Sequence, residues 1–153
     1  MIHNDVLRSV RYMLDISDNK MVEIIKLGGM DVTKDDLLTY LKKDEEEGFV
    51  FCPDDVMAHF LDGLVYLKRG KDETRAPVPF EFPITNNTVL KKLRVAFELK
   101  EDDMHDVLKT AGFSVGRSEL SALLRKKDHV NYRECGDQLL RNFLKGLTMK
   151  TRG

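Results

Sequence analysis

Two cysteines are the side chains best suited to chemistry in this sequence. Cys52 and Cys135 lie 83 residues apart, and each stands where a helical segment is expected to begin. The partial positive charge at a helix N-terminus lowers the pKa of a thiol and raises its reactivity, so both are candidate reactive thiols. Neither has a predictable histidine partner, and free cysteine is among the most buried residue types. We therefore favour two reduced, buried thiols, with redox sensing or a disulfide between the two cysteines as the alternative.

Basic residues in the C-terminal half form a second candidate site. Helical segments on either side of Gly112 suggest a helix-turn-helix, in which the N-terminal turn of the second helix meets base edges. The predicted nucleic-acid contacts are Arg117, Ser121, Arg125, Lys126 and Lys127. The matching turn in the N-terminal half contains Asp35 and Asp36, whose carboxylates would repel phosphate. Any helical hairpin has this pattern, so nucleic-acid binding is the alternative hypothesis, confined to the C-terminal half.

No recognised catalytic or metal-binding motif accompanies these residues. There is no glycine-rich phosphate loop, nucleophile elbow or paired histidine and acid, and the four histidines lack zinc-ligand spacing. We expect no catalysis, metal or cofactor. Arg11 and Arg94 stand on otherwise apolar segments and could hold an anion, but an ion pair with Asp15 or Glu98, four residues on, is a simpler explanation.

The segments that position these residues occur twice. Residues 4–70 return as residues 87–153 without insertion or deletion, with 19 identities over 67 positions. A unit of that size buries only a marginal fraction of its surface, so the two copies are expected to share one core. The pattern predicts a first repeat over residues 1–70, a linker over 71–85 and a second repeat over 86–153.

Each copy has four segments in which apolar residues recur at helical spacing. The predicted fold is all-α: two tandem, pseudo-symmetric four-helix repeats around a shared core. Asn4 and Asn87 are the expected N-caps of the first helices. A glycine inside a helix costs about 1 kcal/mol relative to alanine, so Gly63 and Gly146 in the two fourth helices predict a close helix crossing. We expect the fourth helices to form the contact between the halves.

The linker cannot be a helix, because it holds three of the four prolines. Its apolar residues nevertheless alternate, at Val78, Phe80, Phe82 and Ile84. The alternation predicts an extended strap that buries one apolar face along the helices.

Charge is distributed unevenly between the halves. Residues 1–70 carry 9 Lys and Arg against 14 Asp and Glu, whereas residues 86–153 carry 14 against 9, although the whole chain has a net charge of −1. Opposite charge favours docking of the halves on each other or head-to-tail self-association, and an anionic partner for the basic half is the alternative. No apolar run is long enough to span a membrane and no secretory signal is visible, so a cytoplasmic protein is expected.

Four stretches carry a likeness to a known family. They are residues 4–12, 63–73, 89–97 and 133–141, which include Asn4-Asp-Val-Leu-Arg8, Gly63-Leu-Val-Tyr66 and Arg133-Glu-Cys-Gly136. On these residues the chain resembles the YehS-like family, small bacterial proteins made of a duplicated domain of unknown function. The resemblance covers essentially the whole chain and implies a cytoplasmic bacterial protein with no established activity or site. A non-catalytic protein-interaction or regulatory module, with an unknown protein partner, is the function we expect.

Overall fold

The computed structural model describes all 153 residues and contains eight helices and no strands. The first repeat comprises α1 (His3–Leu14), α2 (Asp18–Leu27), α3 (Lys34–Leu41) and α4 (Asp54–Arg69). The second comprises α5 (Asn86–Ala96), α6 (Glu101–Thr110), α7 (Arg117–Leu123) and α8 (Asp137–Arg152). Each helix of the second repeat begins 83 residues after its counterpart, which confirms two pseudo-symmetric four-helix repeats. None of the eight helices combines the length and apolar character needed to cross a lipid bilayer.

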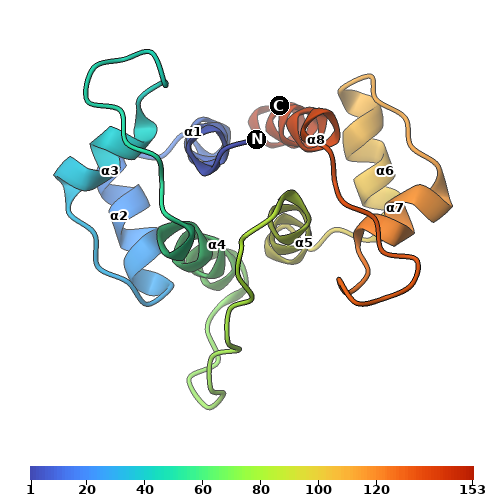
Figure 1. Cartoon of the computed structure of the whole chain (residues 1–153), viewed down its shortest axis with the longest axis horizontal. Coiled ribbons are helices and arrows are strands. Elements are labelled where there is room, and N and C mark those ends of the chain that lie inside the picture. Colours follow the sequence, from blue (N-terminus) through green and yellow to red (C-terminus); the bar gives the residue numbers. More distant parts are fainter.

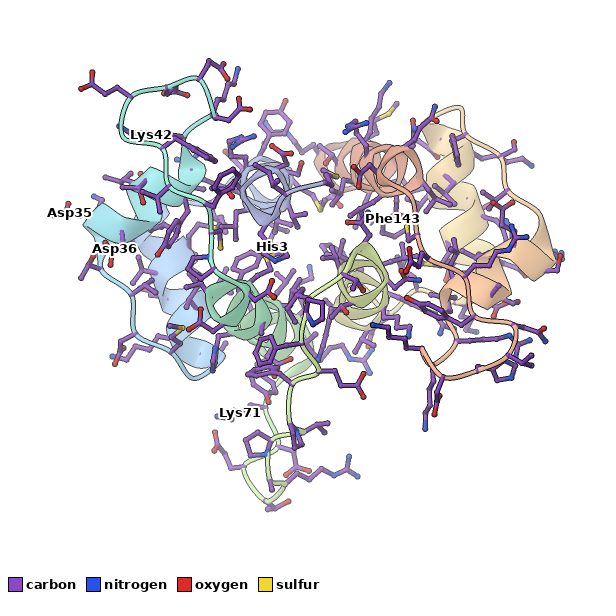
Figure 2. The ribbon with its side chains drawn as sticks, in the orientation of Figure 1. His3, Asp35, Asp36, Lys42, Lys71 and Phe143 are labelled. Atoms are coloured by element: carbon purple, nitrogen blue, oxygen red, sulfur yellow. The ribbon has the colours of Figure 1, made fainter.

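The four long helices α1, α4, α5 and α8 lie at the centre, with α2 and α3 outside one end and α6 and α7 outside the other (Figure 1). A single cluster of 31 buried residues runs through both repeats, so the predicted shared core is confirmed. Phe143 is fully buried and points from α8 toward α5, whereas Asp35 and Asp36 lie at the outer edge of the first repeat (Figure 2).

The two repeats meet through two interfaces that the sequence pattern located only in part. α4 packs against α5, and α1 packs against α8. Each fourth helix therefore contacts the first helix of the other repeat. The expectation that the fourth helices form the contact between the repeats was incomplete, because each interface pairs a fourth helix with a first helix.

The glycines in the fourth helices mark close crossings, as predicted, but with a helix of their own repeat. A Cβ atom added at Gly63 would lie 1.8 Å from the carbonyl oxygen of Ile24 in α2. A Cβ at Gly146 would lie 2.0 Å from the carbonyl oxygen of Val107 in α6. No side chain fits in either place, so the absence of a Cβ lets the fourth helix touch the second helix backbone to backbone.

The strap, residues 71–85, is extended but does not bury the face that its alternation predicted. Val78 is 81% exposed and Phe82 is 55% exposed, whereas Ile84 is buried and Phe80 is half-buried. The prediction was wrong for the first two because the segment projects from the helices as a loop (Figure 1). Its aromatic rings stack edge to face on one another instead, with Phe82 on Phe80 and Phe80 on His59 of α4.

Asn4 and Asn87 are not N-caps, because α1 and α5 each begin one residue earlier, at His3 and Asn86, and the N-caps are Ile2 and Thr85. Both side chains are buried. The Asn4 amide donates to the carbonyls of Tyr40 and Val50, 3.1 and 2.8 Å away, and its oxygen accepts from the backbone N–H of Cys52 at 3.0 Å. Each asparagine thus ties the end of the third helix and the loop before the fourth helix to the first helix.

Candidate functional site

Equivalent ion pairs join the two repeats at both interfaces, in each case between the C-terminal end of a fourth helix and a residue just past the end of a first helix. Arg69, at the end of α4, binds Glu98 after α5 at 2.6 Å. Its counterpart Arg152, at the end of α8, approaches Asp15 after α1 at 3.8 Å. The two pairs are related by the 83-residue offset, so the interfaces share one pseudo-symmetric plan.

These pairs also correct the expected partners of two arginines. Arg11 does not bind Asp15; its Nε donates to the Asp18 carboxylate at 2.8 Å. Arg94 donates to the backbone carbonyl of Leu99 at 3.1 Å. The carboxylates four residues on belong to Asp15 and Glu98, which themselves take the left-handed conformation at the ends of the first helices. Their side chains pair with arginines of the other repeat instead.

The two interfaces carry different charged residues halfway along their helices. In the α4–α5 interface, the Lys92 ammonium donates to the buried Asp62 carboxylate at 2.6 Å. The equivalent positions in the α1–α8 interface hold Ser9 and Lys145. The ion pair is therefore missing from the second interface, and a cation stands where the first has a carboxylate.

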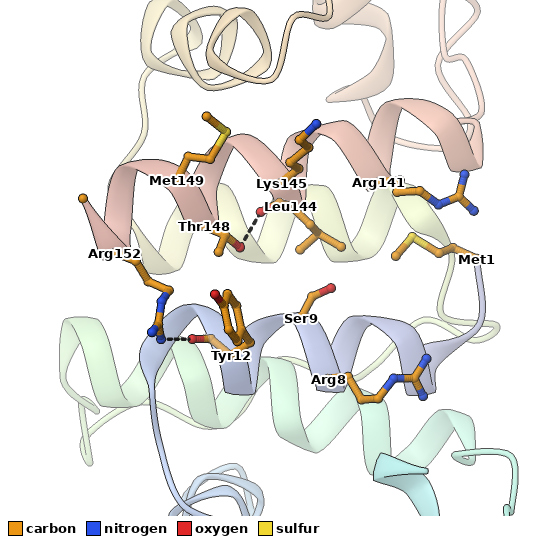
Figure 3. A pocket seen from close by; sticks show the side chains of 11 residues that line it. Met1, Arg8, Ser9, Tyr12, Arg141, Leu144, Lys145, Thr148, Met149 and Arg152 are labelled. Atoms are coloured by element: carbon orange, nitrogen blue, oxygen red, sulfur yellow. Dashed lines mark hydrogen bonds between the residues drawn. The ribbon is translucent and has the colours of Figure 1, made fainter. Parts of the chain in front are cut away.

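A groove of about 740 Å³ opens at the α1–α8 interface (Figure 3). Its lining consists of Met1, Arg8, Ser9, Tyr12, Arg141, Leu144, Lys145, Thr148, Met149, Arg152 and Gly153. This volume lies within the range of about 300–1,000 Å³ common for ligand pockets. None of the strap residues lines it.

Four basic side chains and no acidic side chain line the α1–α8 groove. Arg8 is held by the carboxylate of Asp5 and by the carbonyl of Lys42 at 2.7 Å. Arg141 and Lys145 are exposed and have no ion-pair partner within 4.0 Å. Two basic side chains on the α8 wall thus make no direct ion pair, although Asp137 lies near enough to Arg141 for the guanidinium to lower the pKa of its carboxyl.

Apolar and aromatic surface lies between these charges. The floor includes the buried side chain of Leu144, and Tyr12 on the α1 wall is 61% exposed. The guanidinium of Arg152 lies 4.3 Å from the centre of the Tyr12 ring and donates to the Tyr12 carbonyl at 2.8 Å, which holds the ring in place (Figure 3). The arrangement suits a ligand with both apolar and anionic groups.

The two candidate thiols lie in the core rather than in a groove. Cys52 and Cys135 are both free and buried. Burial raises the pKa of Cys52 to about 12, and the nearby carboxylates of Asp55 and Asp54 add to the rise. Burial and Asp137 raise the pKa of Cys135 to about 11. Desolvation and negative charge oppose the effect of the helix N-terminus, and the buried-thiol interpretation is favoured over reactivity.

Cys135 has the same hydrogen-bonded surroundings in the second repeat as Cys52 has in the first. The Asn87 amide donates to the carbonyls of Leu123 and Arg133 at 3.0 and 2.8 Å, and its oxygen accepts from the Cys135 N–H at 2.8 Å. Because the contact uses the cysteine backbone and leaves a small apolar side chain in the core, the matched asparagine and cysteine pairs have a structural explanation.

The five predicted nucleic-acid contacts do not share one helical face. α7 ends at Leu123, so Arg125, Lys126 and Lys127 belong to the loop that follows it. Within the helix, Arg117 pairs with Asp102 at 3.1 Å. Ser121 lies 3.4 Å from Glu101.

Lys126 and Lys127 instead line a separate polar groove of about 870 Å³, together with Lys91 and Tyr132. The recognition helix that the sequence suggested is therefore short and partly neutralised by α6, and its basic residues are divided between two places.

The residues of the α1–α8 groove were not identified from the sequence. A signal was available in the duplication, because Lys145 is aligned with Asp62 and Ser9 with Lys92. It could be interpreted only once the fold placed Asp62 beside Lys92 and brought Ser9 and Lys145 into one groove. No group of three or more histidine, cysteine and acidic side chains is placed to hold a metal ion.

Fold and groove together define a tandemly duplicated, all-helical protein with one open and one covered interface between its repeats. The chain belongs to a family described as protein of unknown function (DUF1456), whose model matches residues 3–70 and again residues 86–153. It is 49% identical over 150 residues to the uncharacterized protein YehS of Escherichia coli (strain K12). The aligned region covers 98% of this chain and 96% of that relative. No solved structure matches the chain.

Proposed function

We propose that the protein is a non-catalytic protein-interaction or regulatory module that binds its partner in the α1–α8 groove. The observation that supports this is the difference between its two interfaces. The strap and the Asp62–Lys92 ion pair cover the α4–α5 interface, whereas the α1–α8 interface exposes Tyr12 and two unpaired cations. Exposed aromatic and arginine side chains are typical of protein-binding surfaces.

Site-specific photo-cross-linking in cells tests this proposal. A benzophenone amino acid replaces Tyr12 in the groove and, in a control chain, the equivalent Val95, which is 50% exposed at the α4–α5 interface. The proposal predicts a discrete adduct from position 12, lost when Lys145→Glu is added, and none from position 95. Equal adducts from both positions, or none from position 12, would contradict it.

A cytoplasmic location in a bacterium forms part of the proposal. Its support is the pair of free thiols, which suits a reducing compartment, and the Escherichia coli relative.

Nucleic-acid binding remains the second candidate, and the observation that favours it is the polar groove with Lys91, Lys126 and Lys127. Binding there would rest on phosphate contacts and weaken steeply with salt. A gel shift with mixed DNA and RNA at low and moderate salt, repeated with Lys126→Glu plus Lys127→Glu, tests it. No shift at low salt, or a shift that the double variant leaves unchanged, excludes this candidate.

A further inference from the structure

The end of the strap lies beside the α4–α5 interface, where only Phe80 and Ile84 pack against the core. A cavity of about 210 Å³ separates the strap from the α4–α5 interface. Strap residues 78–81 form one wall, and the other consists of Ala58, Leu61, Thr88, Lys91 and Lys92. Burial lowers the pKa of Lys91, and the nearby Glu81 carboxylate acts in the opposite direction. Phe80 thus lies over an apolar floor, and the Glu81 carboxylate lies near the Lys91 ammonium, which itself donates to the Arg125 carbonyl at 2.6 Å.

The same floor and the same cation recur in the α1–α8 groove. By the 83-residue offset, Leu144 is the equivalent of Leu61, and Arg8 is the equivalent of Lys91. Both residues line the groove. The helical surface that the strap covers in one interface is therefore present, and uncovered, in the other.

Two substitutions add positive charge to the open surface and outweigh the one that removes it, Ser9 in place of Lys92. Arg141 stands in place of Ala58, and Lys145 stands in place of Asp62. Neither cation makes a direct ion pair and only Arg141 has a carboxylate nearby, that of Asp137, so an occupant with acidic side chains would pair with both. A peptide offers apolar and acidic side chains together, whereas a nucleic acid would reach the floor only through unstacked bases, which makes a peptide the better match.

From these equivalences, and building on the proposed function, we infer that the α1–α8 groove binds an extended peptide segment of a partner protein that carries an aromatic residue followed by acidic residues. The groove runs along α8 from Arg141 to Arg152, about 16 Å at 1.5 Å per residue. That is the length of about five extended residues. The strap stretch Ala76–Ile84 provides a probe of this chemistry.

The test is a binding titration with the full chain. A fluorescein-labelled peptide with the sequence of Ala76–Ile84 is followed by fluorescence anisotropy at about 50 mM salt. Changing Glu81→Lys or Phe80→Ala in the peptide should weaken binding at least tenfold. So should Arg141→Glu plus Lys145→Glu in the protein. Lys150→Glu is the matched control, because Lys150 is exposed on the same helix outside the groove, and it should change binding less than threefold.

A charge swap provides the decisive comparison. The Glu81→Lys peptide should bind the Arg141→Glu plus Lys145→Glu protein more tightly than it binds the unmodified chain. Absence of saturable binding up to about 1 mM peptide, or loss of affinity that the swap does not restore, overturns the inference. A single-stranded oligonucleotide that binds in place of the peptide, and whose binding the same double variant abolishes, also overturns it.

Failure here is distinguishable from failure of the proposed function. If the peptide does not bind but position 12 still yields a groove-dependent adduct in cells, the protein-interaction function stands and the class of occupant is wrong. If neither is observed, both proposals are wrong.

Discussion

Replacing Gly63 by alanine tests the crossing on which each repeat is built. The new Cβ would lie 1.8 Å from the carbonyl oxygen of Ile24, whereas ordinary contact begins near 3.4 Å. α2 and α4 must therefore move apart by about 1.5 Å, and the contacting atom belongs to the backbone, so no rotamer change can relieve the clash. Ile24 and its neighbours would lose close packing with α4.

The expected sign follows from two opposing magnitudes. Alanine in a helix interior gains about 1 kcal/mol over glycine, but overpacking costs about 1–3 kcal/mol and more where the neighbours are rigid. Because the Ile24 carbonyl is backbone and cannot rotate away, we take the overpacking cost at about 3 kcal/mol and expect Gly63→Ala to lower the free energy of unfolding by about 2 kcal/mol. Gly146→Ala, whose Cβ would lie 2.0 Å from the Val107 carbonyl, should act similarly.

Urea denaturation followed by far-ultraviolet circular dichroism measures the effect as a shift of the midpoint at constant slope. Gly136→Ser is the control, because a Cβ there meets nothing within 4 Å and serine is a favourable N-cap. That variant should be as stable as the unmodified chain or slightly more so. If Gly63→Ala instead raises stability by the helix-propensity gain, the close crossing of α2 and α4 is wrong.

The remaining predictions concern the buried asparagines, the thiols and the ion pairs between the repeats. Asn4→Ala removes three hydrogen bonds to buried backbone groups and should cost about 2–4 kcal/mol in the same urea assay. A cost below about 1 kcal/mol would contradict the structural role of Asn4. Cys52 and Cys135 should react with iodoacetamide at pH 8 far more slowly in the folded chain than in urea, and equal rates would contradict their burial. Because their folded pKa values lie above the ordinary 9.0, their contribution to stability is complete below pH 9 and decreases as pH rises toward 11 and 12. Glu98→Gln breaks an exposed ion pair with Arg69 and should cost less than about 1 kcal/mol, with the difference vanishing at 0.5 M salt in a thermal melt.

The helices and their order could be predicted because their signals are local. Apolar spacing and caps such as Thr33, whose hydroxyl accepts from the Asp36 N–H, act within a few residues of chain. The duplication added a second, independent instance of every element. A shared core followed from size alone, since one repeat of this length has too little interior.

What the sequence left undetermined depends on contacts between distant segments. Asn4 has the residue type of an N-cap, and only the position of the loop at Val50 and Cys52 shows that it binds backbone groups from the core side. Alternation in the strap predicts an extended chain but not how far it stands from the helices, so the exposure of Val78 was missed. Gly63 predicted a close helix crossing, but only the fold shows that the helix it crosses is α2.

The difference between the two interfaces has a physical consequence for function. In a dimer of identical repeats both interfaces would be the same, and any change would act on both. Within one chain they can differ, and here the Asp62–Lys92 ion pair and the strap belong to one interface alone. Arg141 and Lys145 on the other are exposed and take no part in the core, so substitutions there should change stability by no more than about 0.5 kcal/mol. The groove can therefore be altered without unfolding the protein, and a change in binding caused by these variants would report on the site itself.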